Sequence, residues 1–248
     1  MGLFKKERKL DNHTMKHGAP IIVESNPTSP VSEQFRTVRT NIKFSIIGNG
    51  NKSISITSAD PSEGKSVFSA NLAATFAQQG ERTILIDADL RRPTVHRTFM
   101  VSNQNGLSNL LANDVSLDDV IKKTNIDNLD VITSGPVPPN PAELIGSDNF
   151  NKMLDSLNEK YDWILIDTPP VNAATDASLI ANDCYGTIIV VPQGIANKVD
   201  VTNAVEQLKK VHAKILGYVM NRVSAKKSAG YGGYYGGYYG GYYGTEDK

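Results

Sequence analysis

Residues 54–66 of this chain read ISITSADPSEGKS, which predicts a strand, a loop and the first turn of a helix. At such a junction the loop amides and the helix N-terminus can cradle phosphate oxygens. The Lys65 ammonium can reach the terminal phosphates, and the Ser66 hydroxyl can bind Mg²⁺. Ala59 replaces the first glycine of the standard pattern, so the stretch is a variant P-loop.

The variant P-loop predicts that the chain binds ATP with Mg²⁺. The residues expected to contact ATP lie in the loop and the first helical turn: Ala59, Asp60, Pro61, Ser62, Glu63, Gly64, Lys65, Ser66 and Val67. A chance Gly-Lys-Ser sequence at a helix start is the alternative interpretation. The carboxylates that follow two later strands argue against it.

Two aspartates, Asp87 and Asp89, follow an apolar strand in residues 83–93, which read TILIDADLRRP. In an open parallel sheet, ligands bind at the carboxyl ends of the strands. Residues two apart on an extended chain point to the same side. One carboxylate can therefore face Mg²⁺ while the other faces a basic group or an incoming hydroxyl. The alternative is a helix-capping aspartate beside a solvated one.

A second apolar run, residues 163–170, reads WILIDTPP and also ends in an aspartate, Asp167. This is the form of a Walker B segment, whose aspartate holds Mg²⁺ directly or through water. The segment is a weak indication alone. Together with the variant P-loop and the aspartate pair, it predicts one site at the edge of a sheet.

Short apolar runs alternate with helical patterns along the chain. The predicted strands are 53–57, 83–87, 129–133, 163–167, 187–191 and 215–221, and the predicted helices after the first strand are 65–79, 116–123, 149–159, 173–181 and 197–211. Alternation of this kind requires crossovers and favours a mainly parallel sheet. The predicted fold class is α/β, P-loop NTPase-like, with helices on both faces of the sheet and disordered N- and C-terminal tails.

Three regions are expected from the changes in composition. Residues 1–30 are polar and predict a mobile arm, with an extended piece at 20–23. Residues 31–223 form the predicted catalytic domain, which opens with a helix over 33–47 that Ser32 would cap. Residues 224–248 contain the repeat YGGYYGGYYGGYYG, whose glycines and lack of apolar periodicity predict disorder.

The charge balance excludes some functions. Lysine plus arginine equals aspartate plus glutamate at 26 each, so a broad basic face for nucleic acid is not expected. The chain has one cysteine, which fits a reducing cytosol and cannot build a cysteine metal cluster. No apolar run is long enough to span a membrane.

The three motifs together resemble those of the bacterial tyrosine kinases of the capsular and exopolysaccharide type, the BY-kinases. Residues 59–66 match the family's Walker A, 84–91 its Walker A′ and 164–167 its Walker B. Residues 33–39 match its E-x-x-R-x-x-R helix, and 135–144 match a typical proline-rich segment.

The resemblance implies roles for particular side chains. Lys65, Asp87, Asp89 and Asp167 would be catalytic, and Ser66, Asp87 and Asp167 would hold Mg²⁺. Asp87 would contact the acceptor hydroxyl as a base or as an organiser of Mg²⁺. Asn221 matches an adenine-contacting position of related ATPases, although a polar cap at a strand end explains it nearly as well. The family's autophosphorylated tail corresponds here to Tyr231, Tyr234, Tyr235, Tyr238, Tyr239, Tyr242 and Tyr243.

The resemblance also implies partners and a location. The E-x-x-R-x-x-R residues Glu33, Arg36 and Arg39 would mediate a ring-like homo-oligomer. In the Gram-positive branch a separate transmembrane activator recruits the kinase, and a cognate phosphotyrosine phosphatase opposes it. The expected location is cytoplasmic, peripheral at the inner face of the membrane through the activator, with a role in polysaccharide synthesis and export.

Other interpretations stay open from sequence alone. The stripe of Glu33, Arg36 and Arg39 could be a solvated helix face with internal ion pairs. The Gly/Tyr tail could be a sticky low-complexity segment. A partition-type ATPase shares the variant P-loop but usually has a lysine where this chain has Asp60. An ATP-binding scaffold regulated by phosphorylation would share every motif.

Overall fold

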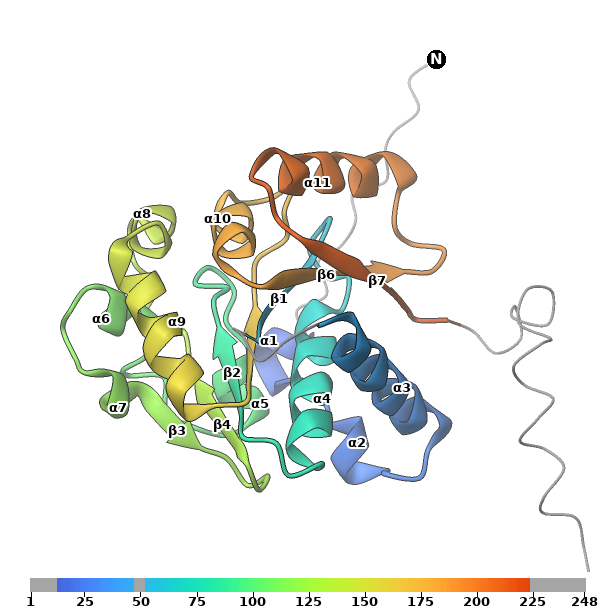
Figure 1. Cartoon of the computed structure of the whole chain (residues 1–248), viewed down its shortest axis with the longest axis horizontal. Helices are drawn as coiled ribbons and strands as arrows, with labels where there is room; N and C mark the ends of the chain where they lie inside the picture. Colours follow the sequence, from blue (N-terminus) through green and yellow to red (C-terminus); the bar gives the residue numbers. More distant parts are fainter. Residues whose placement is uncertain (1–12, 47–51, 224–248) are drawn as a thin grey trace, which may run out of the picture.

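The computed structural model describes residues 13–46 and 52–223, and Figure 1 shows a central sheet between layers of helices. The sheet has seven strands in the order β3-β4-β2-β5-β1-β6-β7. All neighbouring strands run parallel except β3, which pairs antiparallel with β4 at one edge. The strands are β1 (Ser53–Ser58), β2 (Thr83–Asp87), β3 (Ile121–Lys123), β4 (Leu129–Ile132), β5 (Trp163–Asp167), β6 (Gly186–Pro192) and β7 (Ile215–Asn221).

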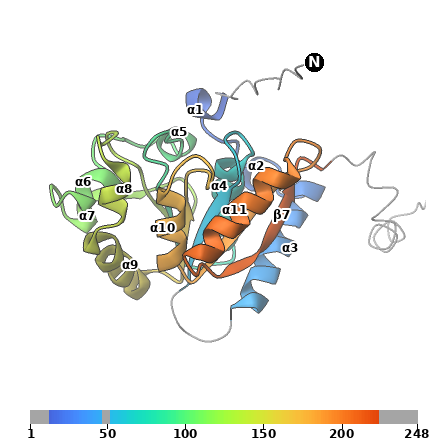
Figure 2. The same cartoon turned by 90° about the horizontal axis from the view of Figure 1, so that it is seen from above.

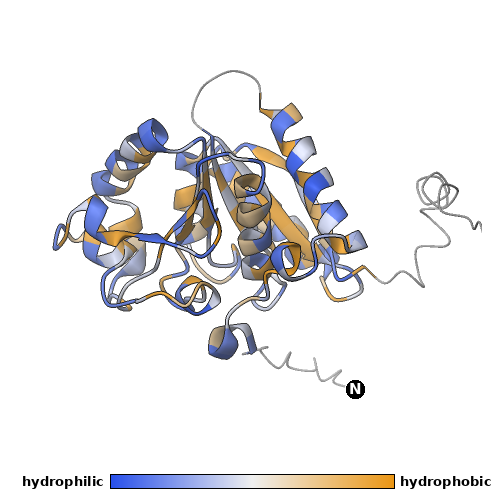
Figure 3. Ribbon diagram, turned by 90° about the horizontal axis from the view of Figure 1, so that it is seen from below, coloured by the Kyte–Doolittle hydropathy of each residue, from blue (hydrophilic) through white to orange (hydrophobic). Residues whose placement is uncertain are grey.

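The central strands are apolar on both faces because helices cover both sides of the sheet. Leu85 and Leu165 point to the face under α4, while Ile84 and Ile164 point to the opposite face. Figure 3 shows hydrophobic strands inside and helices with hydrophilic outer surfaces. The helices before β2 are α1 (His13–His17), α2 (Ile22–Ser25), α3 (Pro30–Ser45) and α4 (Lys65–Ala77). Those after β2 are α5 (Val95–Thr98), α6 (Leu107–Leu111), α7 (Leu117–Val120), α8 (Pro141–Ile145), α9 (Asp148–Lys160), α10 (Asp176–Asp183) and α11 (Lys198–Lys210).

The predicted fold class is confirmed, and the six predicted strands are present within about one residue at their ends. The predicted helix 116–123 is wrong in its second half. It ends at Val120, and residues 121–123 instead add the antiparallel strand β3 to the sheet edge. A three-residue strand with two lysines carries too little apolar alternation to be recognised from sequence.

The N-terminal region differs from the predicted mobile arm in the part that the structure describes. Residues 22–25 form α2 rather than the predicted extended piece. The buried Asn71 side chain of α4 binds this segment, because its oxygen accepts the N–H groups of Ile22 and Val23 and its nitrogen donates to the Pro20 carbonyl. Residues 1–12 and the whole predicted tail, 224–248, lie outside the described residues.

Helix α3 begins earlier than predicted, and Ser29 caps it rather than Ser32. The Ser29 hydroxyl accepts the N–H of Ser32, and Pro30 occupies the first helical position, where its missing N–H is harmless. Ser32 is buried within the first turn.

The stripe of Glu33, Arg36 and Arg39 on α3 makes contacts within the chain. Arg36 pairs with Glu33 and donates to the Pro27 carbonyl at 2.7 Å. Arg39 donates to the Thr75 carbonyl at 2.8 Å, in the last turn of α4, where carbonyls lack helical partners. The predicted role of the stripe in self-association stays a prediction.

We expect Arg39→Met to lower the free energy of unfolding by about 1–2 kcal/mol, because a carbonyl at the end of α4 loses a charged donor. Urea unfolding, measured at subunit concentrations low enough to keep the chain monomeric, checks this. The matched control is Arg97→Met on α5, where the exposed arginine binds no helix end. Loss of self-association with unchanged monomer stability would show that Arg39 acts only between subunits.

Within residues 13–46 and 52–223, no helix has both the length and the apolar composition needed to cross a membrane.

Candidate active site

The loop between β1 and α4 has the conformation that a phosphate-binding loop needs. Gly64 has φ +95°, which favours glycine, and a side chain there would collide with Asn221. The buried Glu63 carboxylate accepts the N–H groups of Ala59 and Asp60 at 3.1 and 3.2 Å. These bonds fold the start of the loop on itself and leave α4 to begin at Lys65 with its N-terminal amides facing the site.

The end of β7 is tied to this loop from far along the chain. The Asn221 amide donates to the Glu63 carbonyl at 3.0 Å, and the Arg222 guanidinium donates to the Ser62 carbonyl at 3.1 Å. Both contacts join β7 to the phosphate loop. The predicted adenine contact of Asn221 stays a prediction, and here its side chain holds the loop.

Lys65 lies among carboxylates from two other strands. Its ammonium is 2.8 Å from Asp89 Oδ2 and 3.9 Å from Asp167 Oδ1. Burial alone would lower the pKa of Lys65, but the two carboxylates outweigh it and hold the pKa above its ordinary value. Burial alone would raise the pKa of Asp89, but the charge of Lys65 and its hydrogen bond outweigh burial and hold that pKa below its ordinary value. Lys65 is therefore fully charged and held in place.

Asp87 and Asp167 face each other at the ends of neighbouring parallel strands, in register across β2 and β5. Asp87 Oδ2 accepts the N–H groups of Thr94 and Val95, both at 2.9 Å, and so caps α5. Burial and the charge of Asp167 raise the pKa of Asp87 to about 8. Burial also raises the pKa of Asp167, whose Oδ1 accepts the Ser69 hydroxyl at 3.1 Å.

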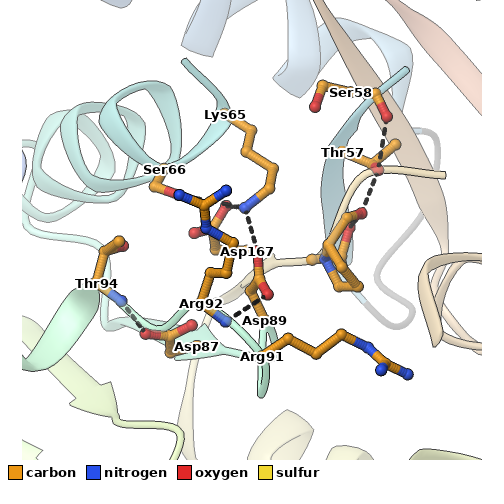
Figure 4. Close-up of polar contacts among 12 residues, drawn as sticks. Thr57, Ser58, Lys65, Ser66, Asp87, Asp89, Arg91, Arg92, Thr94 and Asp167 are labelled. Carbon is orange, nitrogen blue, oxygen red and sulfur yellow. Dashed lines mark hydrogen bonds and ion pairs between the residues drawn. The ribbon is translucent and has the colours of Figure 1, made fainter. Parts of the chain in front are cut away.

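Figure 4 shows that the predicted catalytic side chains converge. Asp89 lies two residues beyond the end of β2, whose bounds are those predicted. Its side chain nevertheless reaches the same site as Asp87, where it binds Lys65 rather than solvent. Asp87 both caps a helix and faces the site, so the two interpretations of the aspartate pair each describe part of the arrangement.

A cavity of about 200 Å³ opens over the phosphate loop. Of the predicted ATP contacts, Pro61, Ser62, Gly64, Lys65, Ser66 and Val67 line it, together with Asp89. Ala59, Asp60, Glu63 and Asn221 lie behind the loop surface and shape it. The rest of the lining comes from later elements and from the N-terminal segment: Thr14, Met15, Arg91, Arg92, Thr94, Pro169, Pro170, Ala173, Ala174 and Arg222.

The residues present fit a magnesium ion. Asp87 Oδ1 and Asp167 Oδ2 are buried oxygens with no hydrogen-bond partner. Among the residues that the structure describes, no three or more His, Cys, Asp or Glu side chains are placed to hold a metal by themselves. Mg²⁺ commonly binds one or two carboxylates and takes its other ligands from substrate phosphates and water. Two carboxylates and the Ser66 hydroxyl at a phosphate loop meet that requirement.

The sequence interpretation did not identify Met15, Arg92 or Arg222 as site residues. Met15 and Arg222 come from the two ends of the described chain, so no local pattern connects them with the loop. Arg92 is three residues after Asp89, and its charge next to the D-x-D-x-R sequence was the signal that could have found it.

The fold and this geometry define an ATP-binding P-loop domain of the α/β class. In agreement, the AAA domain family model matches residues 51–218. The tyrosine-protein kinase YwqD of Bacillus subtilis is 44% identical over 201 residues, which cover 81% of this chain and 85% of that protein. The chain therefore belongs to the bacterial tyrosine-protein kinase family, as the resemblance of its motifs indicated.

Solved structures agree with this assignment. The chimerical protein CapA2B2 has a TM-score of 0.78 and 43% identity, covering 84% of this chain and 96% of that one. The kinase domain of Escherichia coli tyrosine kinase ETK also has a TM-score of 0.78, at 33% identity, covering 90% of this chain and 86% of that one.

The similarity to a septum site-determining protein is lower. The septum site-determining protein MinD from Pyrococcus horikoshii, solved with Mg-ADP, is 29% identical with a TM-score of 0.60. That match covers 70% of this chain and 71% of that chain.

Proposed function

We propose that this tyrosine-protein kinase transfers the γ-phosphoryl group of Mg-ATP to tyrosines of its own C-terminal repeat, between subunits. The observation that carries the proposal is the convergence of Lys65, Asp87, Asp89 and Asp167 at the phosphate loop. For the Gly-rich coil that the sequence predicts, a tail of about 20 residues would have an r.m.s. span of roughly 25 Å, a reach that supports transfer between subunits.

Each side chain has a separate part in this proposal. The loop amides and Lys65 bind the phosphates, and Asp89 keeps Lys65 charged and oriented. Ser66, Asp167 and Asp87 Oδ1 would hold Mg²⁺, which would neutralise charge on the phosphates. Asp87 accepts the proton of the tyrosine hydroxyl, because its raised pKa brings it closer to the phenol's ordinary value near 10.

The physiological setting rests on the relatives. A solved relative is the chimerical protein CapA2B2. Its name supports the proposal that a second protein of the CapA type, a transmembrane activator, recruits and stimulates this chain at the inner face of the membrane. We propose a role in capsular or exopolysaccharide synthesis, regulated by a phosphotyrosine phosphatase.

Incubation with Mg-ATP, with and without the cytoplasmic tail of the activator, followed by detection of phosphotyrosine tests the kinase proposal. No phosphotyrosine under either condition would favour an ATP-binding scaffold. The same reaction with a polyglutamate–tyrosine copolymer tests phosphoryl transfer to tyrosine independently of whether the tail is the acceptor.

Replacing the seven tail tyrosines by phenylalanine should reduce autophosphorylation to background and leave ATP binding unchanged, because only acceptor hydroxyls are lost. Tyr218→Phe is the matched control, since this tyrosine is exposed but lies in the folded domain on β7. Its autophosphorylation should equal that of the unaltered chain.

A mixing experiment tests transfer between subunits. A Lys65→Met chain keeps its tail tyrosines but lacks the phosphate-binding ammonium, and the chain with seven phenylalanines keeps its site but lacks acceptors. Phosphotyrosine should form in the mixture but in neither protein alone. A silent mixture of two folded proteins would contradict transfer between subunits.

A further inference from the structure

Two consecutive arginines after β2 point in opposite directions (Figure 4). Arg91 points away from the phosphate loop, and its Nε and Nη2 atoms are each 3.3 Å from the Asp176 carboxylate on α10. The Asp176 side chain is fully buried, so the Arg91 guanidinium compensates a buried charge. Arg91 therefore joins the end of β2 to α10.

Arg92 is turned toward the phosphate loop. Figure 4 shows its guanidinium beside Lys65 and Ser66, and its side chain lines the same cavity as both of them. Its backbone N–H donates to Asp89 Oδ1 at 3.0 Å, so the carboxylate that binds Lys65 also fixes the backbone of Arg92. Lys65 and Arg92 are thus both positioned by Asp89.

The Arg92 guanidinium is also held from the N-terminal segment. Its Nε donates to the Met15 sulfur at 3.0 Å. Helix α1 lies beside α5 (Figure 2) because Gly18, with φ +78°, lets the chain pass directly against Thr98, whose hydroxyl accepts the Ala19 N–H at 2.8 Å. A thioether is a weak acceptor, so this contact orients Arg92 without neutralising its charge.

We propose that Arg92 contacts the transferring phosphoryl group of ATP and that Met15 positions it, an inference that rests on the proposed kinase function. During transfer the bond between Pγ and the bridging oxygen of ADP breaks, and its electron pair leaves with ADP. A bond forms between Pγ and the tyrosine oxygen, whose proton passes to Asp87. Charge is spread over the three remaining oxygens of the phosphoryl group, and a guanidinium can donate to two of them.

The geometry gives the two arginines different roles. Both line the cavity, but Arg91 is paired with the buried Asp176 carboxylate, whereas the Arg92 guanidinium lies beside Lys65 and Ser66 (Figure 4). An arginine supplied by the same chain can stabilise this transition state by about 10³-fold or more in kcat. Arg92 is therefore a catalytic residue in this proposal, and Met15 is a positioning residue.

The test measures binding of Mg-ADP with and without aluminium fluoride, which together with ADP imitates the transferring phosphoryl group. Arg92→Met should bind Mg-ADP with a Kd within about threefold of the unaltered chain, but should lose about 10²-fold of the tightening that the fluoride produces. Arg97→Met is the matched control, because this exposed arginine lies on α5 outside the cavity, and it should keep the full tightening.

Met15→Ala tests the positioning role, with the exposed Met100→Ala as its control. Met15→Ala should lose about tenfold of the tightening, because a guanidinium that is no longer oriented binds less well. The phosphoryl contact would be overturned if folded Arg92→Met kept the full tightening by aluminium fluoride. It would also be overturned if this variant lost as much affinity for Mg-ADP alone as for Mg-ADP with the fluoride. Full tightening in Met15→Ala would overturn the positioning role. Because this readout needs no acceptor, a failure of tyrosine phosphorylation would count against the proposed function alone.

Discussion

Replacing Lys65 with methionine is expected to lower phosphoryl transfer by about 10³-fold or more, because the charged donor at the terminal phosphates is lost. The same change should destabilise the nucleotide-free protein. Asp89 and Asp167 are both buried and would lose their cationic partner. Removing one member of a buried ion pair costs about 3–5 kcal/mol, which guanidinium chloride unfolding at pH 7 would measure.

A second substitution separates the two effects of Lys65→Met. Adding Asp89→Asn removes one of the orphaned charges, so it should restore part of the stability and none of the activity. Lys209→Met is the matched control, because Lys209 pairs with Glu206 on the exposed surface of α11 and should change neither property measurably. A Lys65→Met protein that is as stable as the unaltered chain would contradict the ion-pair argument.

The central part of the fold follows from local sequence patterns. Strands β2 and β5 are five-residue, mainly apolar segments that each end in an aspartate. A strand that is apolar on both faces belongs in the interior of a sheet covered by helices on both sides. The loop before Lys65 has the order of residue types that phosphate binding requires. These patterns predict that Asp87 and Asp167 meet, because parallel strands present their carboxyl ends at the same edge.

The rest of the site depends on contacts between distant parts of the chain. Arg92 is turned to the phosphate loop by Asp89 and Met15, and Arg91 is drawn away by Asp176. Nothing in the sequence RRP distinguishes one arginine from the other. The N-terminal segment is bound by the buried Asn71 side chain and by Thr98, both distant in sequence, and an asparagine inside α4 would be destabilising without such distant partners.

Asp87 and Lys65 show opposite relations between function and stability. Lys65 stabilises the site, whereas Asp87 is buried beside a like charge and makes the nucleotide-free site less stable. A binding site for Mg²⁺ and phosphate commonly accepts such a cost, because the ligand later supplies the missing charge.

Replacing Asp87 with asparagine is therefore expected to lower phosphoryl transfer by about 10²-fold or more while stabilising the nucleotide-free protein at alkaline pH. Because the pKa of Asp87 is raised to about 8, the folded state binds more protons than the unfolded state between about pH 4 and pH 8. The contribution of Asp87 to stability thus falls as pH rises through that window. Asparagine keeps an oxygen for the N–H groups of Thr94 and Val95 and carries no charge.

Thermal or urea unfolding in the absence of Mg²⁺ and nucleotide, at pH 5 and pH 8.5, checks the sign of this effect. Asp87→Asn should gain stability over the unaltered chain mainly at the higher pH, while Asp155→Asn, at an exposed position of α9, should shift neither measurement. Added Mg²⁺ and ADP should reverse the order of stability, because the ligands compensate the charge that asparagine lacks. An Asp87→Asn protein that is less stable at pH 8.5 than at pH 5, relative to the unaltered chain, would show that the Asp87 carboxylate is charged and well compensated in the folded state before any ligand binds.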